Sequence, residues 1–493
     1  MPTVGKILKG GRRMNDLTKG NSLKLIFFFT IPLLIGNLFQ QLYNVSDTVV
    51  VGQTLGVKAL AAVGATGSIN FLIIGFAQGL TAGLAIITAT RYGARDYKGV
   101  RKSFAASIVI SILMTVVLTV LALTFVDPIL HLMQTPASIF ENARIFISTI
   151  FAGIFASMAF NLLSNIIRAL GDSRTPLIFL MIGTVINVLL ELLFILVFHM
   201  GVAGAGWATV ISQVIASLLC VVYIVRSIPL LHISKDDFRI DFHELWDHFS
   251  TGMPMGFQLS IIAIGTMVMQ AALNSLGTDS VAASTAASKV DQLCSLPMSS
   301  FGVTMATFAA QNFGASKYSR IMEGVKRTLW LSGSFAVFAG GLVIFFGKPI
   351  VTLIIGTADE NVIRLSQTYF NIIGSSYLLL SVLFIIRNTL QGLGRRVLPT
   401  LAGVGELTMR VFAAVFMVGA FGYAGAVSAE PLAWLGSCAI LVPSWIRAVK
   451  QLRNLQRSVD VVEGKTTEEQ AAVASQTAAT QPRLAGAQPK LES

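Results

Sequence analysis

Cysteine, histidine and charged side chains are scarce in this sequence. Among its 493 residues there are three cysteines and five histidines, and only 12% of the residues are charged. Cys220, Cys294 and Cys438 are scattered through apolar stretches, which indicates neither a disulfide framework nor a metal site. Neither a Ser-His-Asp arrangement nor a glycine-rich nucleotide loop occurs in a suitable context. We therefore predict that the protein is not an enzyme, has no ATP-driven machinery and needs no cofactor.

Apolar residues dominate the sequence instead. They make up 54% of the chain, more than the core of a soluble protein of ordinary size can bury. A bilayer is crossed by about 20 helical residues, and twelve continuous apolar runs reach that length. The runs lie near residues 23–50, 59–89, 104–126, 143–167, 175–198, 203–225, 249–275, 280–311, 328–346, 365–386, 397–421 and 431–449. We predict an all-α integral membrane protein with twelve transmembrane helices, surrounded by membrane lipids.

Lysine and arginine are unevenly distributed along the chain, whose formal net charge is +12. The connections after odd-numbered runs hold only Lys58, Arg144, Lys348 and Arg364. Most other basic residues lie before the first run, in the remaining connections or after the last run, among them Arg12, Arg13, Arg91, Arg95, Arg101, Lys102, Arg239, Lys317, Arg320, Lys326, Arg327, Arg395, Arg396 and Arg453. Because cytoplasmic loops are enriched in Lys and Arg, we expect a multi-pass protein of the inner cell membrane with both termini cytoplasmic. The membrane topology accounts for the net positive charge, so we expect no nucleic-acid partner. We also expect the protein to be a monomer.

The two halves of the sequence resemble each other. Short matches recur about 221 residues apart, the sign of an internal repeat. The matching segments include Leu55-Gly56 with Leu276-Gly277, Tyr92-Gly93-Ala94 with Phe313-Gly314-Ala315, Pro32 with Pro254, Leu170-Gly171 with Leu393-Gly394, and 201–205 with 422–426. Since six helices return the chain to the side on which it began, both halves insert with the same orientation. We predict two pseudo-symmetric six-helix lobes.

The repeat and the composition together divide the chain into five parts. We expect a cytoplasmic leader (1–21), a first lobe (22–226), a cytoplasmic linker (227–248), a second lobe (249–450) and a cytoplasmic tail (451–493). The first run follows a basic leader without a small-residue cleavage site, so we interpret it as a retained helix. The tail is rich in Ala, Gln, Thr and Glu without apolar periodicity, which predicts disorder.

Ionisable residues within apolar runs are costly in a bilayer and are therefore candidates for function. The runs contain Asp47, Glu191, Lys289, Asp291, Glu406 and Arg410. Glu406 and Arg410 are four residues apart on one helix face, so we expect them to form a structural charge pair. Lys289 and Asp291 are assigned to the same structural class, but they are two residues apart and must each find another partner.

Asp47 and Glu191 in the first half have no basic residue at comparable depth. Asn187 lies one helical turn before Glu191, and Thr209 supplies a hydroxyl from the next run. Carboxylate, amide and hydroxyl oxygens suit a small cation, while two close carboxylates in a low dielectric favour a shared proton. These four residues therefore form a candidate site for Na⁺ or H⁺. The alternative is that Asp47 caps its helix and Glu191 finds a backbone donor.

Other polar residues of the first run, with one residue of its counterpart, are candidates for a substrate cavity: Asn37, Gln40, Gln41, Tyr43, Asn44 and Gln258. Amides and aromatics suit a promiscuous site for amphipathic molecules, although such residues also occur in ordinary packing. Pro32 precedes Asp47 by 15 residues, roughly 22 Å along a helix, and weakens the helix where bending would be easiest.

Several motifs resemble those of the multidrug and toxic compound extrusion (MATE) transporters, over residues from about 15 to 450. The first-helix motif is matched by Ile31-Pro32, 40–44, Asp47-Thr48, Gly52 and 61–64, and a second signature by 168–176, Asn187, Glu191, 201–205 and Ala208-Thr209. The resemblance implies two lobes around a central cavity that opens alternately to each side. It also implies that Asp47, Asn187, Glu191 and Thr209 occupy the positions of the first lobe's cation site.

The resemblance also implies a function, with one departure. It implies a secondary active antiporter that exports organic cations or other amphipathic small molecules in exchange for H⁺ or Na⁺. Relatives usually carry Asp where Glu191 stands, and acidic residues that another branch carries in the seventh and tenth helices are missing here, with Ile262 near the first of them. The alternatives are a lipid-linked saccharide flippase, for which few deep basic residues are present, and an exporter of an endogenous metabolite.

Overall fold

A computed structural model of the chain, which describes residues 16–355 and 359–480, is nearly all helical. Among these residues eleven helices are long and apolar enough to cross a membrane, and a bent pair makes a twelfth if it counts as one span. This agrees with the predicted all-helical membrane protein. The predicted leader lies mostly outside the described residues.

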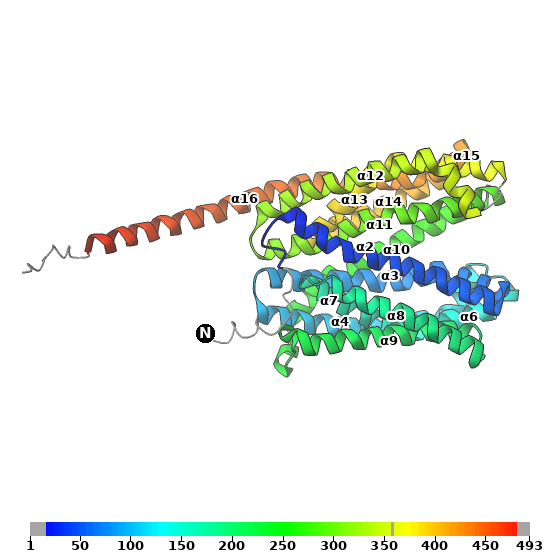
Figure 1. The fold of residues 1–493 in the computed structure, drawn as a ribbon, viewed down its shortest axis with the longest axis horizontal. Coiled ribbons are helices and arrows are strands. Elements are labelled where there is room, and N and C mark those ends of the chain that lie inside the picture. The colour runs from blue at the N-terminus through cyan, green and yellow to red at the C-terminus, as the bar shows by residue number, and fades with distance from the viewer. Residues whose placement is uncertain (1–15, 356–358, 481–493) are drawn as a thin grey trace, which may run out of the picture.

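The first lobe follows the order of the chain (Figure 1). Its helices are α2 (Ser22–Leu55), α3 (Val57–Gly93), α4 (Tyr97–Thr124), α5 (Val126–Leu132), α6 (Ala137–Ala152), α7 (Ile154–Ala169), α8 (Arg174–Leu192), the π-helical turn η1 (Leu193–Val197) and α9 (Val202–Ser227). The pair α6 and α7 is bent by 46° and corresponds to the predicted run 143–167. The bend occurs at Gly153, where a Cβ atom would meet a methyl group of Val210 at 2.1 Å, so the glycine lets α9 approach closely.

The linker and the second lobe complete the bundle. The linker contains two short 3₁₀ turns, η2 (Pro229–Leu231) and η3 (Lys235–Phe238). The second lobe consists of α10 (Phe242–Asn274), α11 (Thr278–Gly314), α12 (Tyr318–Ile355), α13 (Glu360–Gly392), α14 (Val397–Phe412), the π-helical turn η4 (Ala413–Met417), α15 (Val418–Val427) and α16 (Ala429–Thr480). The seventh helix thus begins at Phe242, earlier than the predicted 249.

The C-terminal segment differs from the predicted disordered tail. Helix α16 continues past the bundle to Thr480, and residues 481–493 lie outside the described residues (Figure 1). The segment after residue 450 is rich in Ala, Gln and Glu, whose helix propensity is high. Composition without apolar periodicity argues against packing, but it does not argue against a solvated helix.

Backbone conformation repeats between the two lobes. Positive φ angles occur at Gly56 and Gly277 (82° and 96°), and again at Gly201 and Gly422 (59° and 56°), each pair 221 residues apart in the numbering. Gly171 and Gly394, offset by 223, also have positive φ angles of 93° and 71°. The two π-helical turns follow the fifth helix of each lobe, so the internal repeat is a repeat of local geometry.

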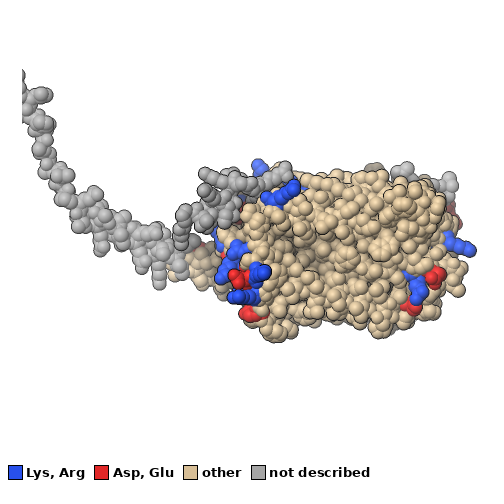
Figure 2. All heavy atoms as spheres, turned by 90° about the horizontal axis from the view of Figure 1, so that it is seen from below, with Lys and Arg blue, Asp and Glu red and all other residues tan. Residues whose placement is uncertain are grey.

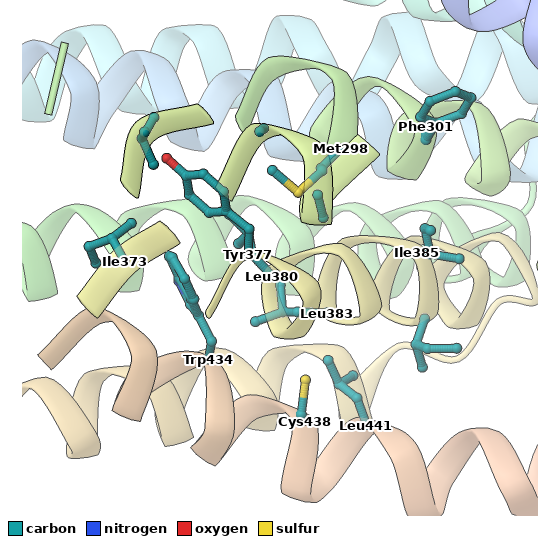
Figure 3. Close-up of a cluster of buried hydrophobic side chains, with 14 of the residues drawn as sticks. Met298, Phe301, Ile373, Tyr377, Leu380, Leu383, Ile385, Trp434, Cys438 and Leu441 are labelled. Carbon is teal, nitrogen blue, oxygen red and sulfur yellow. The ribbon is translucent and has the colours of Figure 1, made fainter. Parts of the chain in front are cut away.

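Each lobe has an apolar core of its own. In the second lobe, side chains from α11, α13 and α16 interlock, as Figure 3 shows for Met298, Tyr377 and Trp434. The core of the first lobe joins residues of α3, α4, α7 and α9, among them Leu84, Phe104, Ile166 and Cys220. Helix α2 serves both lobes, because Ile26 and Phe29 pack into the second-lobe core while Val51 packs with the first lobe.

Basic side chains gather at one end of the bundle, which lies at the left in Figure 2. We call it the basic end; it contains the start of α2 and the linker. The lobes contact each other in this half: Arg91 of α3 forms a bidentate ion pair with Glu244 of α10 at 2.6 and 2.7 Å, and Thr30 of α2 lies 2.8 Å from Thr304 of α11. These contacts close the space between the lobes at the basic end.

The closest approach of the lobes is between α3 and α11. A Cβ atom on Gly314 would meet the carbonyl oxygen of Thr90 at 1.8 Å, and one on Gly93 would meet that of Gln311 at 1.9 Å. The side-chain amide of Gln311 donates to the carbonyl of Ala169 at 2.7 Å and accepts from the backbone N–H of Leu17 at 3.2 Å. Glycine is therefore required for the closed basic end.

Gly314→Ala is expected to force α3 and α11 apart and to destabilise the closed form by about 1–3 kcal/mol, the usual cost of overpacking. Thermal unfolding and hydrogen exchange at 90–95 and 311–316 would measure this. Gly341→Ala in α12 is the matched control, because its Cβ would meet nothing within 4 Å. Equal stability and exchange in the two variants would contradict the prediction.

Candidate cation site

The four residues predicted for a cation site come together between α2, α8 and α9. Asn187 and Glu191 lie one turn apart on α8, and each has 0% of its surface exposed. Asp47 reaches the site from α2, with its carboxyl group near enough to that of Glu191 for the two groups to interact electrostatically. No basic residue forms an ion pair with either acid within the part of the chain that the structure describes.

A hydrogen-bonded support orients the site. The hydroxyl of Thr209 donates to the carbonyl of Ala205 at 3.2 Å, so it accepts from its other neighbours. The hydroxyls of Tyr43 and Thr209 lie 2.8 Å apart and share a hydrogen bond, and the amide nitrogen of Asn187 donates to the Thr209 hydroxyl at 3.4 Å. Since the nitrogen of Asn187 is used in this way, its carbonyl oxygen remains available.

Four buried acceptor atoms of the site have no hydrogen-bond donor among the described residues. They are Oδ1 of Asp47, Oδ1 of Asn187 and both carboxylate oxygens of Glu191. Buried acceptors without a partner cost free energy, and adjacent carboxylates add charge repulsion. Carboxylate and amide oxygens are ligands that hard cations prefer, and a proton between the carboxyl groups would also satisfy two of the acceptors. The residues present therefore fit either Na⁺ or H⁺.

The backbone changes its winding directly beyond Glu191. Helix α8 ends at Leu192 and the π-helical turn η1 follows, with the N–H of Phe198 bonded to the carbonyl of Leu193 at 3.1 Å. Short π-helical insertions often occur at functional sites, because the extra residue re-aims neighbouring side chains. Gly201 with a φ of 59° then starts α9, which carries Thr209.

The second lobe has different residues at the positions related by the repeat. The offset of 223 found at Gly171 and Gly394 relates Asn187 to Arg410, and the offset of 221 found at Gly201 and Gly422 relates Thr209 to Glu430. The guanidinium of Arg410 donates to both oxygens of Glu430, at 3.1 and 2.8 Å. An ion pair thus stands where the first lobe has an amide and a hydroxyl.

Space for this guanidinium comes from α10. The offset of Pro32 and Pro254 relates Tyr43 to Gly265 and Asp47 to Met269. A Cβ atom on Gly265 would meet Cδ and Nη1 of Arg410 at 3.0 and 3.2 Å. The second lobe has therefore replaced the tyrosine and the aspartate by residues that admit an internal cation.

Arg410 belongs to a row of alternating charges. It lies 3.6 Å from Glu406, which forms a second ion pair with Arg387, and Arg387 donates to the hydroxyl of Ser437 at 2.8 Å. Arg387, Glu406 and Arg410 are each less than 5% exposed. The positive and negative charges of this row balance within the second lobe.

Lys289 and Asp291, predicted as structural charges, have separate surroundings. Asp291 accepts a hydrogen bond from the hydroxyl of Tyr377 at 2.9 Å. The side chain of Lys289 is exposed, and no carboxylate among the described residues lies within ion-pair distance of it. Placing Lys289 and Asp291 in charge pairs is therefore wrong in this structure, because Lys289 is exposed with no carboxylate of the described residues in reach and Asp291 is bonded to a hydroxyl.

The predicted cavity residues do not form one surface. Gln40 and Asn44 are exposed and Gln41 is half-buried, so these three are available for contact. Asn37 donates to the hydroxyl of Ser300 at 3.0 Å and thereby joins the lobes, while Tyr43 supports Thr209. Gln258 is buried and accepts from Gln391 of α13 at 2.7 Å, inside the second lobe. Burial by neighbouring helices decides these positions, and residue type alone does not reveal it.

Three residues of these networks escaped prediction from the sequence. Arg387 and Glu430 fall just outside the predicted apolar runs, so a count of charges within the runs omits them. Tyr43 was assigned to the cavity because its run is polar, although it supports the cation site. The internal repeat could have identified Glu430, because the offset of 221 places it opposite Thr209.

Comparison with known proteins places the chain among membrane transporters. The sequence model of the MatE family matches it twice, over residues 32–193 and 254–416. The probable multidrug resistance protein YpnP of Bacillus subtilis is 30% identical over 385 residues, which cover 77% of this chain and 84% of that protein.

Solved structures show the same fold. A multidrug resistance MATE family transporter of the MOP superfamily in an outward-facing conformation superposes with a TM-score of 0.82 at 21% identity, covering 90% of this chain and 100% of the other. A MATE structure in the bent conformation gives a TM-score of 0.82 at 22% identity, covering 90% of this chain and 98% of the other.

Arg410→Met is expected to destabilise the protein by about 3–5 kcal/mol, because it leaves the carboxylates of Glu406 and Glu430 without this partner. Thermal unfolding of the purified protein would measure the loss, and adding Glu430→Gln should restore part of it. Arg144→Met, which breaks the half-exposed pair with Asp127, is the control and should leave thermal unfolding almost unchanged. Similar losses in the two single variants would refute an internal role for the Arg410 guanidinium.

Proposed function

The chain belongs to the MatE family, whose members are membrane transporters and not enzymes, and on this premise we propose that it is a secondary active multidrug efflux antiporter. It exports amphipathic or cationic small molecules in exchange for H⁺ or Na⁺. The observation that carries the proposal is the group of four buried acceptor oxygens of Asp47, Asn187 and Glu191 that lack a donor. A site of this kind is stable only with a cation or proton bound, and its occupancy can therefore report an ion gradient.

The orientation in the membrane follows from the charges. The basic end holds the linker and most Lys and Arg residues, so it faces the cytoplasm by the positive-inside rule. The lobes contact each other at that end, which is the arrangement expected of a transporter that is open toward the outside. Similarity to a relative solved in an outward-facing conformation supports this assignment.

Coupling runs through the first lobe alone. Its site has two acids without a counter-charge, whereas the equivalent place in the second lobe holds the guanidinium of Arg410 paired with Glu430. Because the guanidinium is part of the chain, it stays in place whatever the ion gradient. The second lobe then behaves as if a cation were always bound, and only the first lobe binds and releases one during transport.

Helix α2 connects the ion site to the contact between the lobes. Asp47 lies toward one end of it, while Thr30 and Asn37, on either side of Pro32, bond to Thr304 and Ser300 of the second lobe. Pro32 has no N–H to donate to the carbonyl four residues earlier, so bending there costs less than elsewhere in the helix. Binding of a cation at Asp47 would bend α2 at Pro32 and change the space between the two lobes.

Asp47→Asn is expected to reduce gradient-driven transport by about tenfold or more, in the range of ordinary coupling free energies. The measurement is efflux of a dye from proteoliposomes under an imposed pH or Na⁺ gradient. Asp127→Asn is the control, because Asp127 is a half-exposed partner of Arg144 far from the site in sequence and should leave transport unchanged. Undiminished gradient-driven efflux in the Asp47 variant would rule out the coupling model.

Glu191→Asp is expected to keep transport but to change the ion that drives it. Removing one methylene withdraws the carboxylate by about 1.5 Å, which separates it from that of Asp47. A wider gap disfavours a shared proton and favours a coordinated Na⁺. The ratio of Na⁺-driven to pH-driven efflux should therefore rise. An unchanged ratio would show that the length of this side chain does not set ion preference.

A further inference from the structure

One face of α3 is exposed in the half of the bundle away from the basic end. The exposed residues are Val57, Ala61, Gly64, Ser68 and Phe71, spaced by four and three residues along one side of the helix. The same face continues to Gly75, Gly79 and Gly83, where added Cβ atoms would touch Leu259, Met255 and Gly252 of α10. Because the face is buried between the lobes at one end, we infer that its exposed part faces the space between the lobes at the other. We call this space the interlobe cleft.

Helix α11 contributes the matching wall of the interlobe cleft. Its exposed residues are Thr278, Ala282, Thr285, Lys289 and Gln292, each 221 positions after its counterpart in α3. The same face continues to Ser300, which bonds Asn37 of α2, and to Gln311, which bonds the first-lobe carbonyl of Ala169. Lys289 therefore projects from a wall of the interlobe cleft, and the repeat relates its position to that of Ser68 in α3.

Lys289 carries an uncompensated charge in the interlobe cleft. Away from their ends, helices α2, α3, α10 and α11 contain three residues of the Asp, Glu, Lys and Arg types: Asp47, Lys289 and Asp291. Asp47 turns toward Glu191 inside the first lobe, and Asp291 is bonded to Tyr377 inside the second. Only the ammonium of Lys289 has no anionic partner among the described residues of these segments.

The depth of Lys289 makes this charge informative. It lies eleven residues after the start of α11, about 16 Å along the helix axis at 1.5 Å per residue. An ammonium at such a depth is costly unless water or an anion surrounds it. Leu293 lies one turn after Lys289 on α11 and is 52% exposed. On the corresponding helix of the first lobe, α3, Phe71 is 44% exposed. A basic group beside exposed apolar side chains matches a molecule with an acidic head and an apolar body.

We propose that the interlobe cleft binds amphipathic substrates with an anionic group, a carboxylate, sulfonate or phosphate, which pairs with Lys289. The apolar part of the substrate lies against Phe71 and Leu293. This proposal rests on the proposed transport function and narrows it, because it favours organic acids over organic cations. The ion and the substrate then bind at different places, the ion at Asp47 and Glu191 and the substrate at Lys289.

The test compares two probes that share a skeleton and differ in the sign of their charge, 6-phenylhexanoate and 6-phenylhexylammonium. Calorimetric titration of the full chain in nanodiscs of zwitterionic lipid gives their affinities. The wild type should bind the carboxylate about tenfold more tightly than the ammonium, and Lys289→Met should lose this preference. Lys58→Met, at an exposed lysine near the start of α3, should keep it. Tighter binding of the ammonium to the wild type, or an unchanged preference in Lys289→Met, would overturn the proposal.

Two further variants separate the possible causes of a negative result. Lys289→Arg keeps the charge and should keep the preference, and its failure would point to disturbed folding of α11 or to a role of Lys289 other than charge. Asp47→Asn should leave the preference intact while abolishing ion coupling. If Asp47→Asn leaves coupling intact while Lys289→Met loses the preference, the antiport model fails and the substrate site stands. If Asp47→Asn loses coupling while Lys289→Met keeps the preference, the antiport model stands and the substrate site is refuted.

Discussion

The negative charge of Asp47 and Glu191, buried without a fixed counter-charge, is the constraint on which the function of the first lobe depends. Four acceptor atoms at this place have no donor among the described residues. In a low-dielectric surrounding the repulsion between the carboxylates is strong, so the lobe gains stability whenever a cation or proton arrives. The hydrogen bonds from Tyr43 and Asn187 to Thr209 hold the oxygens together and prevent the site from relaxing by moving them apart.

The two lobes show how one architecture can support opposite electrostatics. The backbone repeats down to the glycines with positive φ and the π-helical turns, so the difference lies in side chains. Gly265 and Met269 replace Tyr43 and Asp47, and the space that opens is filled by the guanidinium of Arg410. A fixed ion pair gives a lobe that does not respond to ions. In the proposed mechanism the missing counter-charge makes the first lobe responsive to ions, and one responsive lobe is enough to couple transport.

The fold and the core of the site follow from the sequence, because apolar length, charge placement and the repeat are one-dimensional signals. Asp47 and Glu191 stand out because acids in apolar runs are rare, and Asn187 is noticed because it lies one turn before Glu191. Lys289 is a different case, since its exposure depends on how far apart two helices lie at one level, which no pattern in its own helix records. Arg387 and Glu430 lie at the ends of apolar runs, where composition does not define depth. The helical continuation of α16 shows that composition predicts packing better than local structure.

The separation of the ion site from Lys289 constrains how coupling can work. Asp47 faces into the first lobe and Lys289 projects from the second lobe into the interlobe cleft, so an anion at Lys289 and a cation at Asp47 do not compete for the same charge. The proposed mechanism therefore does not use direct displacement of one by the other. It uses a mechanical link through α2, which carries Asp47 and is bonded through Thr30 and Asn37 to the second lobe. Pro32 lies between these two bonds, at the point where a change in the first lobe can alter the width of the cleft.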